Sequence, residues 1–159
     1  MFRPMRRKKQ CLDEREAVAI LERNTAGTLA LLGNNGYPYA VPLSYVYHDG
    51  MLYFHSASSG HKIDAIKQYD KASFCVIDQD HVVPEQYTTH YKSVVAFGKV
   101  HLMEDEAQRR EILTMLAMKY CADYHHGIEA EIDAYIENMA VLAFSIEHIT
   151  GKAAIELMR

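Results

Sequence analysis

The sequence predicts a mainly β fold, an antiparallel barrel of about six strands with helices packed on its flanks. The strongest evidence is two tight turns, Asn34-Asn35-Gly36 and His48-Asp49-Gly50, because Asn, Asp and Gly tolerate the positive φ of short hairpin turns. Short apolar segments flank both turns, and two hairpins in succession indicate an antiparallel meander, not a βαβ sheet. No repeat or linker interrupts the chain, so we expect a single domain over residues 1–159.

The composition suits one hydrophobic core. The 159 residues are 49% hydrophobic and 24% charged, which is ordinary for a globular domain. A chain of this size buries roughly 68–70% of its unfolded surface. The net charge of −4 argues against a general nucleic-acid binder, which presents a basic face. No segment approaches the ~18 consecutive apolar residues of a membrane span, so we expect no membrane association.

Residues 1–10 form a basic arm ahead of the first expected helix, with five cations: Arg3, Arg6, Arg7, Lys8 and Lys9. The arm is either a solvated segment or a contact for phosphate or an interface. Because no apolar stretch follows it before Asp13, we do not expect it to act as a signal peptide. Three widely spaced cysteines without a CxxC pair favour a reducing compartment, so we expect a cytoplasmic protein. The adjacent His125-His126 does not suit a shared ion on a regular helix, and we expect no metal site.

The expected elements follow from local patterns. Asp13 and Glu16 form a capping-box pattern that starts the first helix. Pro42 lies inside an expected strand and lacks an N–H to donate, which implies an edge position, a bulge or a ligand-facing kink. An acidic start and Lys119 near the end suit the dipole of the longest helix. In chain order we expect a helix at 13–23, strands at 28–32, 39–47 and 51–55, a helix at 61–69, a strand at 73–77, a polar loop at 78–89, a strand at 91–103, helices at 105–120 and 128–138, and a strand at 140–146.

The segment from His55 to Lys62 has the clearest chemical signal. A strand ends there, small residues with three serines and Gly60 follow, and a helix begins next to Lys62. Free N–H groups at a helix start attract an anion, and glycine lets the backbone approach closely. Serine hydroxyls and a lysine cation would add to the binding. This is the chemistry of a phosphate site; the alternative is a serine-rich helix cap that binds nothing.

The strand from Tyr39 to Tyr45 is the second signal. Its surface is apolar, and Pro42 keeps the backbone out of a regular hydrogen-bonded ladder. Such a surface suits a large planar ring system with occasional backbone donors. The alternative is an ordinary edge strand with aromatic packing.

Five stretches stand in a recognisable order: Gly36-Tyr37-Pro38-Tyr39, Val41-Pro42-Leu43-Ser44-Tyr45, Tyr53-Phe54-His55, Gly60-His61-Lys62-Ile63-Asp64 and Val95-Ala96-Phe97-Gly98. Together they resemble the pyridoxamine 5′-phosphate oxidase-like flavoproteins, and within them the 5-nitroimidazole-resistance branch. The opening Met5-Arg6-Arg7-Lys8 and the closing Glu147-His148-Ile149-Thr150-Gly151-Lys152 fit the same pattern. The resemblance spans nearly the whole chain.

The resemblance implies an FMN-binding, six-stranded split β-barrel that forms a homodimer with the flavin at its interface. It places the flavin phosphate near His61 and Lys62 and the strand Val41–Ser44 along the isoalloxazine ring. His55 is then the candidate catalytic proton donor, or alternatively a residue that packs on the ring. The implied cofactor-binding residues, of which the last two would come from the partner subunit, are Val41, Pro42, Leu43, Ser44, His55, Ser56, Ser59, Gly60, His61, Lys62, Ser93 and Val94.

The same resemblance implies a flavin-dependent reductase of small oxidised acceptors, such as nitroaromatics of the 5-nitroimidazole type. The electron donor stays open, with NAD(P)H as one option. The chain lacks the paired-arginine phosphate signature of a true pyridoxamine phosphate oxidase, so that substrate is not expected. FAD in place of FMN stays open, as does another planar cofactor such as a deazaflavin or haem. A non-catalytic flavin carrier or redox sensor is the main alternative. The other is nucleic-acid or partner binding through the basic arm, against which the net charge argues.

Overall fold

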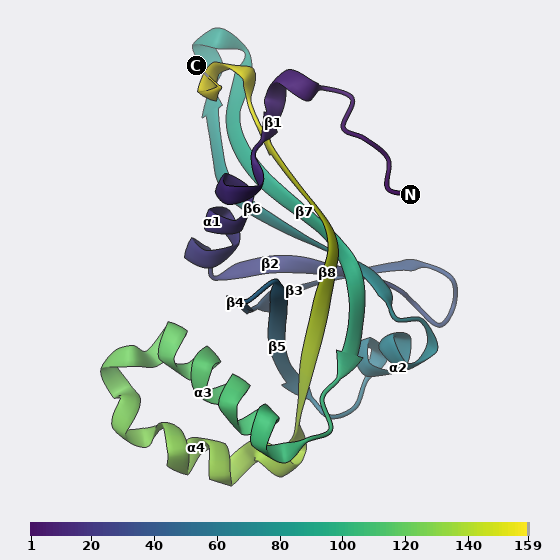
Figure 1. The fold of residues 1–159 in the computed structure, drawn as a ribbon, viewed down its shortest axis with the longest axis vertical. Helices are drawn as coiled ribbons and strands as arrows, with labels where there is room; N and C mark the ends of the chain where they lie inside the picture. Colours follow the sequence, from purple (N-terminus) through teal and green to yellow (C-terminus); the bar gives the residue numbers. More distant parts are fainter. Residues whose placement is uncertain (159) are drawn as a thin grey trace.

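One large antiparallel sheet dominates the computed structural model, which describes residues 1–158 (Figure 1). The strands are β1 (Cys11–Leu12), β2 (Ala26–Leu32), β3 (Pro38–Ser44), β4 (Val46–His48), β5 (Met51–Ala57), β6 (Lys71–Val83), β7 (Thr88–Leu102) and β8 (Met139–Ala153). The α-helices are α1 (Glu14–Arg23), α2 (His61–Gln68), α3 (Glu106–Cys121) and α4 (Ile128–Tyr135). Short 3-10 helices cover Lys8–Gln10, Pro84–Gln86, Ala122–Gly127, Ile136–Asn138 and Ile155–Leu157.

The sheet is an open, split barrel. Its strand order is β3-β2-β6-β7-β8-β5-β4, and β1 pairs with β8. Because β3 ends the sheet on one side and β4 on the other, the barrel is not closed. The six expected strands correspond to β2, β3, β5, β6, β7 and β8, to which the short β1 and β4 are added. The predicted antiparallel split barrel with flanking helices is therefore confirmed.

The local signals at the start of the chain are confirmed as well. The Asp13 side chain accepts a hydrogen bond of 2.8 Å from the backbone N–H of Glu16 and so caps α1. Asp49 and Gly50 both have positive φ, 47° and 79°, as a two-residue hairpin turn requires. Gly36, with φ of 80°, closes the first hairpin between β2 and β3.

The main core joins one face of the sheet to α1 and α2. Its largest fully buried side chains are Tyr45, Phe54, Phe74 and Phe144. The Tyr45 and Phe74 rings meet edge to face at 5.0 Å between centroids, and the Phe54 and Phe74 rings lie 5.1 Å apart. The buried Tyr45 hydroxyl donates a hydrogen bond of 2.7 Å to the Leu21 carbonyl, so this aromatic cluster also fixes the end of α1.

Helices α3 and α4 form a hairpin that covers the other face of β5 and β8 (Figure 1). Apolar side chains of both helices, among them Ile112, Leu116 and Ile132, form a second buried cluster with Val46 and Val141 of the sheet. The Arg109 guanidinium donates hydrogen bonds to the carbonyls of Ile136 and Met139 and so ties α3 to the segment between α4 and β8. Among the described residues, no helix is long and apolar enough to cross a membrane.

The structure corrects three sequence expectations. The polar loop expected over residues 78–89 is wrong, since β6 and β7 continue as a paired ribbon that the 3-10 turn Pro84–Gln86 closes. Much of this ribbon is exposed to solvent, which explains its polar residues. A bulge between Ile77 and Gln79 interrupts the pairing of β6 with β7. The strand expected over residues 39–47 divides at Tyr45 into β3 and β4. The last strand extends past residue 146, because β8 pairs with β7 as far as Ala153.

Candidate functional site

Strand β3 lies at the end of the sheet and pairs only with β2 in the described chain. Pro42 stands opposite Thr28 on this strand, which confirms the edge position inferred from the proline. The side chains of Val41 and Leu43 pack against the main core, whereas Pro42 and Ser44 are exposed on the opposite face. This strand therefore offers an exposed backbone edge and a small, largely apolar outer surface.

The loop after β5 leaves the start of α2 without a side-chain cap. Gly60 is the N-cap residue, with φ of 120°, and no side chain bonds to the first-turn N–H groups. The Ser56 hydroxyl donates instead to the Ala57 carbonyl, and the backbone N–H of Ser58 bonds to the Asn138 carbonyl at 3.3 Å. The serine-rich segment is therefore not a helix cap, and its free N–H groups are available to an anion.

Lys62 is a half-buried cation next to this helix start. Burial lowers its pKa, and among residues 1–158 no carboxylate forms an ion pair with it. A buried charge normally has a partner. A lysine in this position, beside uncapped N–H groups, is suited to an anionic ligand.

His61 fixes α2 against the end of the sheet. Its ring stacks on Tyr39 of β3, with centroids 4.4 Å apart. A Cβ at Gly33, in the turn between β2 and β3, would lie 3.0 Å from the His61 Nε2, so the glycine makes room for this ring. This stacking places the start of α2, where the sequence suggested a phosphate site, next to β3, where it suggested a surface for a planar ring. The two sequence signals therefore meet at one place.

His55 lies on the exposed face of β5, opposite Val141 of β8. The pKa of His55 is lowered, first by partial burial and then by the positive charge of Lys62. The imidazole thus stays neutral further into the acidic range than a free histidine, and at neutral pH one ring nitrogen can accept a hydrogen bond while the other donates one.

A cavity of about 320 Å³ opens between this face of the sheet and the helical hairpin. Ser44 and His55 form its sheet side, and Leu113, Leu116 and Tyr120 of α3 form part of the opposite side. None of these helical residues was among the site residues predicted from the sequence. The position of aromatic Tyr120 at the end of an otherwise aliphatic face was the one available signal for a different role.

The structure does not bring Ser93 and Val94 to this site within one chain. Both lie on β7, which β2 and β6 separate from β3. The Val94 side chain is fully buried in the main core, so only its backbone could face a ligand. Their assignment to a flavin site across a dimer interface stays a prediction.

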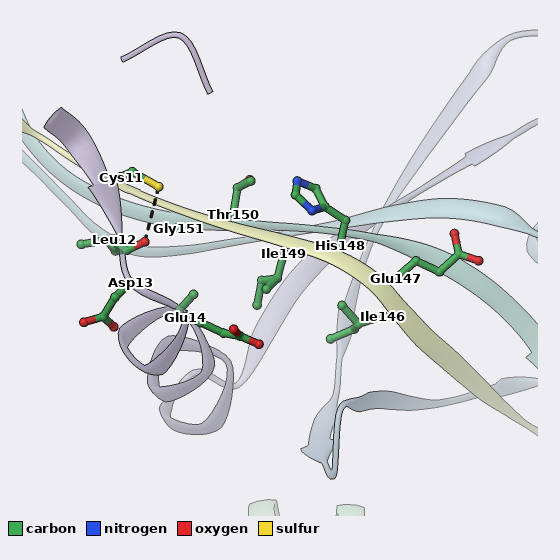
Figure 2. Close-up of a pocket in the computed structure, with 11 residues that line it drawn as sticks. Cys11, Leu12, Asp13, Glu14, Ile146, Glu147, His148, Ile149, Thr150 and Gly151 are labelled. Carbon is green, nitrogen blue, oxygen red and sulfur yellow. Dashed lines mark hydrogen bonds between the residues drawn. The ribbon is translucent and has the colours of Figure 1, made fainter. Parts of the chain in front are cut away.

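A second cavity, of about 310 Å³, lies apart from these residues, between the start of α1 and the C-terminal half of β8 (Figure 2). Figure 2 shows Ile146 and Ile149 pointing toward α1, with His148 and Thr150 on the other side of the strand. The candidate site residues of β3, β5 and α2 do not line it. Among residues 1–158, no group of three or more His, Cys, Asp or Glu side chains could hold a metal ion.

Solved structures with the same fold cover most of the chain. A candidate 5-nitroimidazole antibiotic resistance protein from Bacteroides thetaiotaomicron is 22% identical, with a TM-score of 0.75 over 90% of this chain and 86% of its own. An FAD-binding protein from Mesorhizobium loti is 25% identical, with a TM-score of 0.68 over 91% and 97%. The flavocytochrome Anf3 from Azotobacter vinelandii is 20% identical, with a TM-score of 0.77 over 95% and 72%.

No curated protein sequence matches this chain. The model of one protein family, described as pyridoxamine 5′-phosphate oxidase, matches residues 13–153. The match starts at the N-cap of α1 and ends at the last residue of β8, so it includes every strand of the sheet except β1. With most of its sequence matched in this way, the chain belongs to the pyridoxamine 5′-phosphate oxidase family.

Proposed function

We propose that this protein binds a flavin, FMN in the first instance, on β3 and the loop from His55 to Lys62. The single observation that carries the proposal is Lys62, a half-buried cation without a carboxylate partner in the described chain, at the uncapped start of α2. The FAD-binding protein from Mesorhizobium loti shares the fold and supports the same cofactor class. FAD would make the same ring contacts, so the choice between the two flavins depends on what lies beyond the phosphate.

The residues present fit this cofactor class. Lys62 and the free N–H groups after Gly60 would hold the phosphate, with Ser59 and His61 beside it. The outer face of Val41–Ser44 would lie along the ring system, where Pro42 and Ser44 are exposed. His55 and Ser56 complete the set at the end of β5. A bound flavin would supply the two-electron redox chemistry, and the protein would supply orientation and proton transfer.

The activity that this site supports best is the reduction of small oxidised acceptors, with nitroaromatics such as 5-nitroimidazoles as the expected class. Reduction of a nitro group to a nitroso group consumes two electrons and two protons and releases one water. NAD(P)H would supply the electrons as a hydride. His55, with a neutral imidazole at pH 7, would donate a hydrogen bond from its ring N–H to a nitro oxygen and pass on one proton, which solvent restores.

The proposed assembly is a homodimer with a flavin site at each interface. It would bring Ser93 and Val94 of the partner subunit to the flavin. Within a single chain these two residues lie away from β3.

A non-catalytic flavin carrier or redox sensor would share the binding residues. Measuring turnover of NAD(P)H with a nitro acceptor distinguishes such a protein from a reductase.

The test is Lys62→Ala compared with Lys67→Ala, an exposed lysine on the same helix. Loss of one charge-assisted hydrogen bond costs roughly 1.5–3 kcal/mol, so Lys62→Ala should weaken flavin binding roughly 10- to 150-fold. Lys67→Ala should bind flavin as the parent protein does. Unchanged affinity in Lys62→Ala would remove this residue from the site.

A further inference from the structure

We infer that the cavity between Ser44, His55 and the helical hairpin is the subsite that receives the acceptor, and that it selects neutral or cationic aromatic molecules over anions. The inference rests on the proposed function, because His55 and Ser44 belong to both the expected flavin site and the cavity. It assigns to α3 and α4 a binding role that the flavin site does not require of them.

The size and surface of the cavity fit a one-ring molecule. Its volume of about 320 Å³ is at the lower end of the roughly 300–1,000 Å³ of small-ligand pockets. The helical side presents mainly aliphatic groups, with Leu113 and Leu116 from α3 and Ile132 from α4. A flat apolar ring could lie against these side chains with its reducible group toward His55.

A neighbouring hollow of about 340 Å³ lies beside the cavity on the hairpin. The two share Ala117, Cys121, Glu131 and Ile132 as lining residues. The outer hollow reaches Tyr124 and Gly127 in the exposed turn between α3 and α4. The apolar surface next to His55 therefore continues along α3 and α4 on the side away from β3.

The charge on the cavity wall is the selective feature. Glu131 is the single Asp or Glu on this wall, and no described Lys, Arg or His forms an ion pair with it. The lowered pKa of His55 keeps the facing imidazole neutral at pH 7. A carboxylate-bearing acceptor would therefore meet a negative wall, whereas a neutral acceptor would not.

Hydrogen bonds hold the cavity open in a defined shape. The Tyr120 hydroxyl ties the last turn of α3 to the β3–β4 junction at Tyr45. At the other end of the helix, the Arg109 guanidinium bonds to the Ile136 and Met139 carbonyls at 2.5 and 2.6 Å. Both ends of α3 are fixed to the body of the protein, so the cavity does not depend on a ligand to form.

The first test fills the cavity in the flavin-loaded protein. Leu116→Phe and Ala117→Leu add bulk to its lining, and Met118→Phe adds comparable bulk to an exposed position of the same helix. The dissociation constant of para-nitrobenzyl alcohol, measured by titration calorimetry, should rise roughly tenfold in both cavity variants. Flavin content should stay as in the parent, and Met118→Phe should change neither quantity. Unchanged binding of the alcohol in folded cavity variants would overturn the subsite.

The second test compares para-nitrobenzyl alcohol with para-nitrobenzoate, which differ in charge. The parent should bind the alcohol roughly fivefold more tightly or better. Glu131→Gln should remove most of this preference, whereas Glu129→Gln, on the same helix but off the cavity wall, should keep it. Equal binding of the two probes by the parent, or an unchanged preference in Glu131→Gln, would overturn the selectivity.

Failure of the proposed function would give a different result. If the purified protein neither contains nor binds flavin, the same titrations on the flavin-free protein still report whether the cavity binds the neutral probe. Binding that the cavity variants abolish supports the subsite without a reductase, and absence of binding overturns it.

Discussion

The hydroxyl of Tyr120, in the last turn of α3, accepts a hydrogen bond of 2.9 Å from the backbone N–H of Tyr45, where β3 gives way to β4. The same hydroxyl lies close to the carbonyls of Tyr45 and Thr25, to one of which its single proton can be donated. Lys119, the preceding residue, donates to the Asn24 carbonyl at 2.6 Å and lies 4.4 Å above the Tyr45 ring. The helical hairpin is thus anchored at the strand that the flavin is proposed to contact.

Tyr120→Phe should therefore destabilise the fold, because it leaves the Tyr45 N–H and one carbonyl without their partner. We expect a loss of about 1–3 kcal/mol in the free energy of unfolding, measured by urea denaturation. Tyr124→Phe is the matched control, since Tyr124 is 79% exposed on the following turn. Equal stability of the two variants would show that the Tyr120 hydroxyl does not anchor the helix.

Gly98 is required by the contact between β7 and β8. A Cβ at this position would overlap the backbone carbonyl of Ser145, next to the irregularity between Phe97 and Gly98. Gly98→Ala should lower the free energy of unfolding by about 1–3 kcal/mol or more, because backbone must move to accept the methyl group. Gly127→Ala has open space for its Cβ and φ of −99°, so thermal unfolding should show little change there.

The Arg23 guanidinium binds both carboxylate oxygens of Asp78, at 2.8 and 2.7 Å, beside the bulge of β6. These bonds, together with one from Asn24, hold the pKa of Asp78 below its ordinary 3.8. The folded state thus favours the ionised carboxyl, so its stabilising effect is present above pH ~4 and is lost as the pH falls through the lowered pKa.

Asp78→Asn should reduce the free energy of unfolding at pH 7 by about 1 kcal/mol and weaken its dependence on pH below ~4. Asp80→Asn, an exposed residue on the same strand, should leave both quantities unchanged. Acid denaturation curves of the three proteins check this, and coincident curves would contradict the role of the pair.

For His55, burial and the Lys62 charge both favour the neutral imidazole, so its pKa should lie below 6.5. A depressed histidine pKa stabilises the folded state above pH 6.5 and loses that effect as the pH falls below it. Lys62→Met should raise the His55 pKa part of the way back, and Lys67→Met should not. The measurement is an NMR titration of the histidine ring protons, and a His55 pKa at or above 6.5 in the parent would contradict the structure.

The sequence predicted the barrel because its hairpins and edge strand depend on local chemistry. Glycine and asparagine turns determined the hairpins, and the missing N–H of Pro42 determined the edge strand. The break between β5 and α2 was visible in the serines and Gly60. The stacking of His61 on Tyr39 brings these segments together in space. It depends on tertiary contacts that no local pattern encodes.

The remaining features depend on packing between distant segments. The ribbon over residues 78–89 was read as a loop because most of its residues are polar and it lacks the regular alternation of a half-buried strand. The position of α3 on a cavity was missed because an aliphatic stripe predicts burial without revealing that Leu113 and Leu116 border a hollow. Val94 was selected through the family resemblance, although its side chain is fully buried in the core.

The most direct test of the central claim is the absorption spectrum of the purified protein, followed by mass identification of any chromophore that denaturation releases. A flavin site at Lys62 should give flavin absorption bands, with FMN or FAD released, and a Lys62→Ala preparation should retain much less flavin. A colourless protein that also fails to bind added FMN and FAD would contradict the claim and leave only the split-barrel fold.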